Sequence, residues 1–229
     1  MNVHFFAGIQ IALAIFINGP IVNAQSDADG HLSWWPAYYL KYSINSKWAL
    51  NSDLQLRNFN KQPVLGLLGL RTGAHYTFSK GWSTAVGVLW FHYHSIQDSK
   101  DVNSDEFRVY EELRNDWRLS NKWRLANRLR TEQRHFSNQE GIAFRIRYHL
   151  AAEYRVAKRW SAIGGNELMW QGSERRKNWD QYRLWAGGEY AFNANNQVQL
   201  IFMNWWQFNA DIYQPVIRIN FVQSINAGL

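Results

Sequence analysis

Two absences set the first limits on this sequence. It has no cysteine, which excludes disulfide bonds, thiolate metal sites and a lipid-modified cysteine. After residue 24 it also has no long apolar run, because the longest candidate, VLGLLGL at residues 64–70, is far below the roughly 18 residues of a membrane-spanning helix. The sequence from residue 25 onwards therefore predicts no transmembrane helix.

The N-terminal segment has the pattern of a secretory signal. Residues 5–17 (FFAGIQIALAIFI) form an apolar run too short to span a bilayer, followed by Gly19-Pro20 and by a small-residue VNA sequence that ends at Ala24. The preceding MNVH carries no lysine or arginine, which leaves an N-terminal membrane anchor as the alternative. We expect a signal peptide at residues 1–24 and a single domain at residues 25–229.

Aromatic and charged residues are abundant. The chain has 13 tryptophans, 11 tyrosines and 13 phenylalanines, more than a soluble core needs. Its formal net charge is +7, which would suggest a nucleic-acid or anionic-membrane partner if the charges faced outward. Hydrophobic residues make up 46% of the chain, yet the mean hydropathy is −0.44, so apolar and polar residues must be finely interleaved.

A short polar turn followed by tryptophan recurs along the chain. The four copies end at Trp48, Trp82, Trp123 and Trp160, and a fifth turn at residues 193–197 lacks the tryptophan. Longer connections, at residues 60–63, 96–105, 137–140, 172–178 and 208–215, alternate with these turns. Short turns that alternate with longer loops predict β-hairpins in an up-and-down meander with two unlike ends.

Residues alternate strictly within the expected strands. In residues 123–136 (WRLANRLRTEQRHF) the arginines stand at even positions, whereas Trp123, Leu125 and Leu129 stand at odd ones. Residues 106–119 and 142–156 alternate in the same way. A period of two excludes a helix, whose apolar stripe recurs every three or four residues.

Strand length and aromatic position favour a membrane over water. Strands of 11 to 15 residues suit a tilted transmembrane strand, which needs about 9 to 11 residues in hydrocarbon. Trp48, Trp82, Trp123 and Trp160, each beside a tight turn, are typical of an interfacial girdle. A second set near the longer loops predicts the opposite girdle: Phe59, Phe91, Tyr93, Phe136, Trp170, Trp179, Trp206 and Phe208. The alternative is a soluble lipocalin-like barrel that binds a ligand.

The arginines fix the register of a membrane barrel. Each arginine that faced lipid at the midplane would cost about 2–4 kcal/mol, so a one-residue slip of three such strands would cost on the order of 10–30 kcal/mol. We therefore expect a charge network inside the barrel: Arg108, Glu112, Arg114, Arg118, Arg124, Arg128, Arg130, Glu132, Arg134, Arg145, Arg147, Glu153, Arg155, Glu167 and Arg183.

Hairpin register predicts cross-strand partners. If residue 119 pairs with residue 123, Glu112 lies opposite Arg130, and Asn115 lies opposite Asn127 on the lipid face, where the two can share hydrogen bonds. A four-residue loop at 137–140 places Glu132 beside Arg145, and Arg124 beside Glu153. Glu111 falls on the lipid face, which we interpret as a bulge or a position at the outer interface.

Several segments together resemble a known family. They are SKWALNSDLQLRNF, LLGLRTGAHYTF, EFRVYEELRNDWRL leading into RLANRLRTEQRHF, FRIRYHL and QYRLWAGGEYAF, and they are similar to a domain-of-unknown-function family of small bacterial outer-membrane β-barrels. The resemblance covers nearly all of residues 25–229. It implies an outer-membrane barrel of about 12 strands with no established activity, and it assigns no functional residues.

The predicted fold is all-β, an up-and-down antiparallel transmembrane β-barrel of about 12 strands (range 10–12). Eleven strands can be read from the pattern, and bacterial single-chain barrels usually have an even number. A twelfth would come from HLSWW at residues 31–35 or from the tail after Phe221, VQSINAGL. We expect a monomer in the bacterial outer membrane, with membrane lipid as its partner.

The predicted register gives the interior an excess of positive charge. The inward arginines are 57, 71, 108, 114, 118, 124, 128, 130, 134, 145, 147, 155, 183 and 218. The inward acids are Asp53, Glu106, Glu112, Asp116, Glu132, Glu153, Glu167 and Glu189. This interior would attract small anions. The positive net charge of the chain therefore indicates an anion-attracting lumen rather than nucleic-acid binding. The protein then has either a structural role, with the lumen filled by side chains, or a role in passive passage of small anions or other solutes.

Catalysis is a separate hypothesis. His92 and His94 lie near one loop, with Ser95 and Asp98 beside them and His135 on a neighbouring strand. A histidine here could serve a lipid-modifying hydrolase or acyltransferase of the outer membrane, or bind a metal. No motif fixes a nucleophile, an oxyanion hole or a third metal ligand, so we assign no catalytic, cofactor-binding or metal-binding residue and leave enzymatic activity open.

Overall fold

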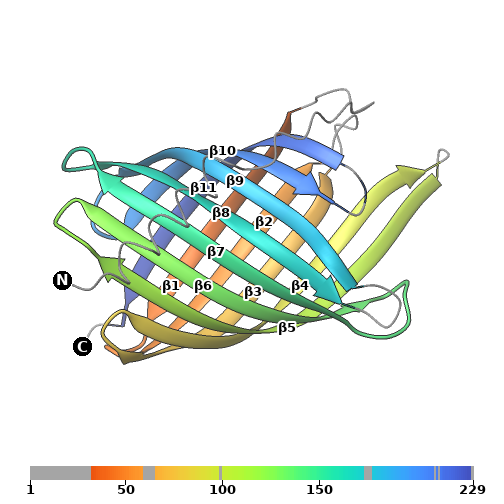
Figure 1. Cartoon of the computed structure of the whole chain (residues 1–229), viewed down its shortest axis with the longest axis horizontal. Helices are drawn as coiled ribbons and strands as arrows, with labels where there is room; N and C mark the ends of the chain where they lie inside the picture. The colour runs from red at the N-terminus through yellow and green to blue at the C-terminus, as the bar shows by residue number, and fades with distance from the viewer. Residues whose placement is uncertain are drawn as a thin grey trace.

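The computed structural model describes residues 32–58, 65–97, 100–172, 177–208, 210 and 212–227. These residues form eleven strands in one closed barrel (Figure 1). The strands are β1 (Ser33–Ser43), β2 (Trp48–Asn58), β3 (Leu65–Ser79), β4 (Trp82–Gln97), β5 (Lys100–Arg118), β6 (Trp123–Phe136), β7 (Ala143–Arg155), β8 (Trp160–Gly172), β9 (Lys177–Ala191), β10 (Asn196–Gln207) and β11 (Ile212–Asn226). The expected signal peptide, residues 1–24, lies outside the described residues.

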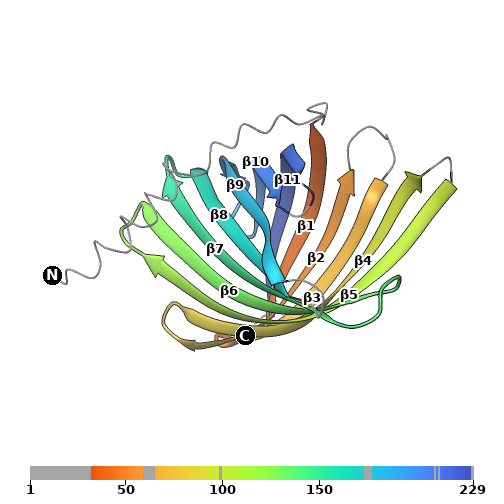
Figure 2. The same ribbon diagram turned by 45° about the vertical axis from the view of Figure 1, so that its right-hand side comes forward.

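Every strand pairs antiparallel with its neighbour in sequence, and β1 and β11 close the barrel as a parallel pair (Figure 2). An up-and-down meander with an odd number of strands requires this, because its first and last strands then point the same way. Ser33 to Trp35 open β1, and residues 222–226 extend β11. Neither segment adds a twelfth strand within the described chain, and the count of eleven falls inside the expected range.

The two ends of the barrel differ as the sequence predicts. Tight turns join the strands at one end, where Asn45 Oδ1 accepts the backbone N–H of Trp48 at 2.8 Å and Ser120 Oγ accepts that of Trp123 at 3.1 Å. Such side-chain caps are the reason that asparagine and serine favour turns. At the other end, the hairpin of β4 and β5, the strands of 16 and 19 residues, projects beyond the rim (Figure 1). Among the described residues there is no helix long and apolar enough to cross a membrane.

The outer wall is apolar and carries an aromatic girdle at the turn end. Trp48, Trp82, Trp123 and Trp160 have 38–55% of their surface exposed. Three of them pack on a tyrosine directly across the strand pair, with ring centroids 4.7–4.8 Å apart: Trp48 on Tyr76, Trp123 on Tyr154 and Trp160 on Tyr190. Further along the strands the outer positions hold residues such as Val86, Leu129 and Phe202.

The expected second girdle is partly wrong. Trp179 faces outward with 55% of its surface exposed, but Phe91 is only 3% exposed and packs inside against Leu67 and Leu89. Tyr93 and Phe136 also face the lumen, where they line its cavity. Strand parity explains the error, since Phe91 and Tyr93 stand on the same face of β4 as the buried Leu89. Phe59 lies outside the described residues.

Candidate functional site

Glu132, on β6, is the centre of the charged interior. Its side chain is 1% exposed, and its carboxylate accepts hydrogen bonds from Arg145 Nη2 at 2.6 Å, Arg147 Nη1 at 2.7 Å and Arg108 Nη1 at 3.4 Å. Arg130 Nη1 lies 3.6 Å away. Alternation on β5, β6 and β7 places all of these side chains on the inner face. One buried carboxylate is therefore shared by four guanidinium groups.

Glu106, on β5, holds the network towards the loop end. It is fully buried and accepts hydrogen bonds from Arg108 Nε and Arg134 Nε, both at 2.5 Å, and from the Tyr93 hydroxyl at 2.8 Å. Arg108 also reaches Glu132. Because Arg108 contacts both glutamates, the two carboxylate sites form one connected unit.

Glu112 and Glu167 extend the network across β5 to β8. Arg130 Nη2 donates to Glu112 at 2.5 Å, and Arg147 Nη2 donates to Glu167 at 2.8 Å. Arg128 bridges the two acids, with Nη2 2.6 Å from Glu167 and Nε 3.8 Å from Glu112. Charge-assisted hydrogen bonds of this kind hold arginines in place that would otherwise be buried and unpaired. We call Glu106, Glu112, Glu132, Glu167 and their arginines the arginine–glutamate ladder.

The predicted cross-strand register is confirmed pair by pair. Glu112 lies opposite Arg130, Glu132 opposite Arg145, Arg124 opposite Glu153 and Asn115 opposite Asn127. The shared hydrogen bond expected for the two asparagines is not formed, because Asn127 Oδ1 instead accepts the Tyr148 hydroxyl at 2.8 Å.

Four of the expected network residues lie apart from the ladder, at the turn end: Arg118, Arg124, Glu153 and Arg155. The Arg124 side chain is 52% exposed and contacts Asp116 at 2.8 Å and Glu153 at 3.6 Å. Arg118 and Arg155 are exposed, and neither forms an ion pair within the described chain. The other expected residues join the ladder: Arg114 contacts Glu112, and Arg183 Nη1 lies 3.4 Å from Glu167.

The sequence reasoning missed Asp180, on β9. Met169 on β8 pairs with Gln181, but the next residue of β8, Trp170, pairs with Trp179, so a bulge leaves Asp180 as the extra residue. Asp180 is 9% exposed and its Oδ2 lies 3.4 Å from Arg145 Nη1. A bulge re-aims a side chain against the alternation, and the interrupted alternation at residues 179–181 was its one signal in the sequence.

Glu111 lies on the outer wall without a bulge. Its pairing with both β4 and β6 is continuous. Its carboxylate accepts hydrogen bonds from Thr131 Oγ1 at 2.6 Å and Gln133 Nε2 at 3.1 Å. Two donors on the neighbouring strand thus satisfy this outward carboxylate, so the bulge interpretation is wrong.

Two inward arginines stand on the wall opposite the ladder. Arg57, on β2, donates through Nη2 to Gln55 Oε1 at 2.8 Å, and its guanidinium lies 4.3 Å from the Trp35 ring centre. Arg218, on β11, donates through Nη2 to the Tyr39 hydroxyl at 3.0 Å. Among the described residues, neither arginine contacts a carboxylate. These two positive charges are therefore not neutralised by the ladder.

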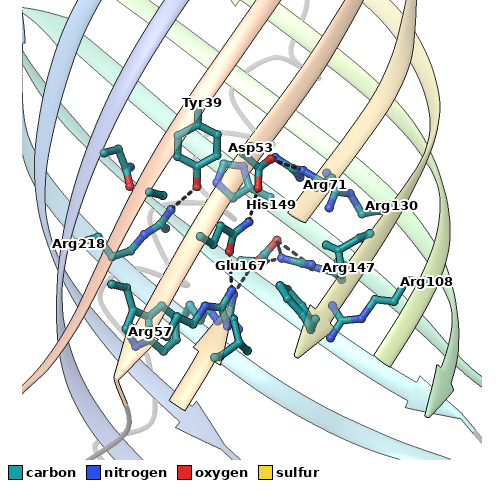
Figure 3. A pocket seen from close by; sticks show the side chains of 18 of the residues that line it. Tyr39, Asp53, Arg57, Arg71, Arg108, Arg130, Arg147, His149, Glu167 and Arg218 are labelled. Carbon is teal, nitrogen blue, oxygen red and sulfur yellow. Dashed lines mark hydrogen bonds and ion pairs between the residues drawn. The ribbon is translucent and has the colours of Figure 1, made fainter. Parts of the chain in front are cut away.

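A cavity of about 690 Å³ lies between the two walls. Every one of the eleven strands contributes to its lining, which includes Arg57, Arg218, Tyr39 and Arg147 (Figure 3). The figure shows Arg57 and Arg218 on one side and the pair of Arg147 and Glu167 nearby. The polar interior is thus not filled completely by the ladder.

The histidines of the alternative hydrolase hypothesis pair with acidic residues of the same hairpin. His92 Nδ1 lies 2.9 Å from Asp105 and His94 Nε2 lies 3.0 Å from Asp101, on the outer face of the β4–β5 hairpin. Ser95 follows His94 directly and so points to the other face of the strand. Asp98 lies outside the described residues. Within the described chain, no group of three or more His, Asp or Glu side chains is placed to hold a metal ion.

A closed barrel with an apolar outer wall and a charged lumen defines a β-barrel of the outer-membrane class. Residues 32–214 match the model of a protein family of unknown function, DUF2490. The chain belongs to this family, in agreement with the resemblance found in the sequence. No curated protein matches the sequence.

Solved structures of similar fold include three barrels. OmpT, an outer membrane protein of Vibrio cholerae, is 14% identical with a TM-score of 0.44, over 72% of this chain and 52% of that one. The KdgM porin in complex with disordered oligogalacturonate is 14% identical with a TM-score of 0.46, over 73% and 81%. The β domain of the Bordetella autotransporter BrkA is 13% identical with a TM-score of 0.43, over 79% and 82%. The chain spans about half the length of OmpT, and these likenesses concern the fold alone.

Proposed function

We propose that this protein is a monomeric barrel of the bacterial outer membrane that allows small anions to pass through its lumen. The observation that carries the proposal is the pair Arg57 and Arg218, two positive charges that face a cavity and contact no carboxylate of the described chain. Fixed charge of one sign in a narrow, low-dielectric passage concentrates the counter-ion. The lumen should therefore prefer anions to cations.

The arginines of the ladder differ from Arg57 and Arg218 in having carboxylate partners. Its arginines are held by Glu106, Glu112, Glu132 and Glu167 at 2.5–3.8 Å, so much of its charge is compensated within the wall. A ladder of this kind stiffens β5 to β8 and fills their side of the lumen. The ladder nevertheless has eight arginines and four glutamates, so its excess positive charge adds to that of Arg57 and Arg218.

The outer wall supports placement in a membrane. Val86, Leu129 and Phe202 are 46–60% exposed on its surface, and the tryptophan–tyrosine pairs mark one edge of this apolar wall. In water, exposing apolar surface costs about 25 cal/mol per Å², whereas in a bilayer this wall meets lipid. Membrane lipid is accordingly the proposed partner.

Two measurements test the proposal. Heat-modifiable migration on a gel together with resistance to alkaline extraction would support membrane insertion, and release by mild alkali would overturn it. In planar bilayers under a KCl gradient, the zero-current potential should show preference for chloride, and Arg57→Gln with Arg218→Gln should move it towards zero. Lys158→Gln, which removes one positive charge at an exposed turn, should leave the zero-current potential unchanged. A folded barrel without conductance, or without anion preference, would overturn anion passage and leave a structural role.

A further inference from the structure

Three arginines from different strands surround one tryptophan of the lumen. The guanidinium of Arg57 lies 4.3 Å, and that of Arg183 5.6 Å, from the ring centre of Trp35. Arg218 lies directly opposite Trp35 in the register of β1 and β11. The three arginines belong to β2, β9 and β11, and all of them line the cavity. We call Arg57, Arg183 and Arg218 the arginine triad.

The carboxylates of the wall do not balance the charge of the triad. Arg183 contacts Glu167 at 3.4 Å, but Glu167 lies closer to Arg128, at 2.6 Å, and to Arg147, at 2.8 Å. One negative charge is thus shared by three arginines. The other two members of the triad contact no carboxylate of the described chain. The triad therefore carries more than two positive charges that the surrounding wall leaves unbalanced.

Neutral partners hold the two unpaired arginines in place. Gln55 Oε1 accepts a hydrogen bond from Arg57 Nη2 at 2.8 Å, and the Tyr39 hydroxyl accepts one from Arg218 Nη2 at 3.0 Å. Arg57 lies close enough to Arg218 and to Arg183 for their charges to interact. Like charges held together in a medium of low dielectric repel one another, and an anion bound among them relieves that repulsion.

The donors of the triad suit an anion with several oxygens. A guanidinium has five N–H groups in one plane, and its fork can donate two parallel hydrogen bonds to two oxygens of one group. Arg57 and Arg218 each use one N–H in the hydrogen bonds above. Chloride is a single atom and cannot accept two parallel bonds, and an anion of one charge leaves positive charge unbalanced. An oxyanion with two negative charges matches both the donors and the charge.

We propose that the arginine triad is a binding site for a tetrahedral oxyanion with two negative charges, the chemical class of inorganic phosphate and sulfate. The site deepens the proposed anion passage and rests on it for the route by which the anion enters. Arg57 and Arg218 are half-buried rather than buried, so an anion in the lumen reaches them. Their forks bind its oxygens, and Arg183 adds a third positive charge beside them.

The test uses the folded full-length protein in detergent micelles and measures binding of radiolabelled inorganic phosphate by equilibrium dialysis, with unlabelled anions as competitors. Sulfate keeps the tetrahedral shape and the double charge, nitrate keeps oxygens with a single charge, and chloride has a single charge and no oxygen. Phosphate and sulfate should bind at least about tenfold more tightly than nitrate or chloride, a difference of about 1.4 kcal/mol. Equal affinity for nitrate or chloride would overturn the proposal in favour of a general anion lumen, and absence of phosphate binding would overturn it outright.

Variants locate the site within the lumen. Arg57→Gln and Arg218→Gln should each weaken phosphate binding at least about tenfold, because each removes charge-assisted hydrogen bonds to the anion, and Arg183→Gln should weaken it several-fold. Arg114→Gln is the matched control: it removes the same charge from the lumen, but near the turn end and beside Glu112, so phosphate affinity should stay unchanged. Wild-type affinity in all three triad variants, or an equal loss in the control, would overturn the proposed site.

Two readouts keep this site separate from anion passage. Anion preference in bilayers without phosphate binding would remove this inference alone, whereas phosphate binding without conductance would remove anion passage alone. Heat-modifiable migration confirms that each variant is folded. The comparison of anions uses the wild-type chain, so it tests the proposal even where a variant fails to fold.

Discussion

Replacing Glu132 by glutamine tests the ladder most directly. The substitution keeps the shape of the side chain and removes its charge, which leaves Arg145 and Arg147, now 2.6 and 2.7 Å from the carboxylate, without their shared counter-ion. Their side chains are 4% and 11% exposed, so water cannot replace the lost charge. Removing one partner of a buried ion pair costs about 3–5 kcal/mol, and we expect a loss of this size in the free energy of unfolding.

The assay is urea unfolding of the barrel from lipid vesicles, followed by tryptophan fluorescence. Glu153→Gln is the matched control, because the Glu153 side chain is 27% exposed and its oxygen lies 3.6 Å from an Arg124 that is 52% exposed. Exposed pairs contribute about 0–1 kcal/mol, so this variant should differ little from the wild type. Equal losses in the two variants would refute the argument that burial of the ladder sets its contribution.

Three further predictions concern the wall. Gly87→Ala should destabilise by about 1–3 kcal/mol, because a Cβ there would overlap the Thr72 carbonyl oxygen and the Tyr110 hydroxyl. Gly188→Ala, where a Cβ would meet nothing within 4 Å, should be neutral or stabilising in the same unfolding assay, and a reversed order would contradict the packing. Leu129→Arg should cost about 2–4 kcal/mol in vesicles if Leu129 faces lipid at the midplane, and no loss would favour the soluble lipocalin-like barrel. Asp180→Asn should lower the free energy of unfolding less than Glu132→Gln does, because Asp180 lies 3.4 Å from Arg145 and Glu132 lies 2.6 Å from it. An equal loss would show that Asp180 stabilises the ladder as much as Glu132 does.

Strand alternation made the inner and outer faces predictable from sequence. In β6 each arginine stands at an even position, whereas Trp123, Leu125 and Leu129 stand at odd ones, and the energy of placing arginine in lipid allows one register only. The opposition of Glu112 and Arg130 follows from that register and a short turn. The tryptophans that follow four of the five tight turns predicted the position of the girdle.

The features that the sequence reasoning placed wrongly or missed have separate causes. Asp180 reaches the lumen because β9 has one residue more than β8 between their paired positions, and an extra residue shifts parity without changing composition. Phe91 and Tyr93 were placed outside because aromatic residues near loops suggest a girdle, yet their parity on β4 puts them inside with Leu89. The contact of Tyr93 with Glu106 joins two strands, and side-chain reach across strands is set by three-dimensional packing.

The parallel closure of the barrel also decides which side chains meet inside it. Both β1 and β11 start at the loop end, so Trp35, near the start of β1, lies directly beside Arg218 on β11. β2 returns to the loop end on the other side of β1 and brings Arg57 to the same ring. A twelfth strand inserted between β1 and β11 would separate these two strands by two spacings, about 9–10 Å rather than about 4.8 Å, and would remove Arg218 from the tryptophan. The odd strand count therefore determines which charges meet in the lumen as well as how the sheet closes.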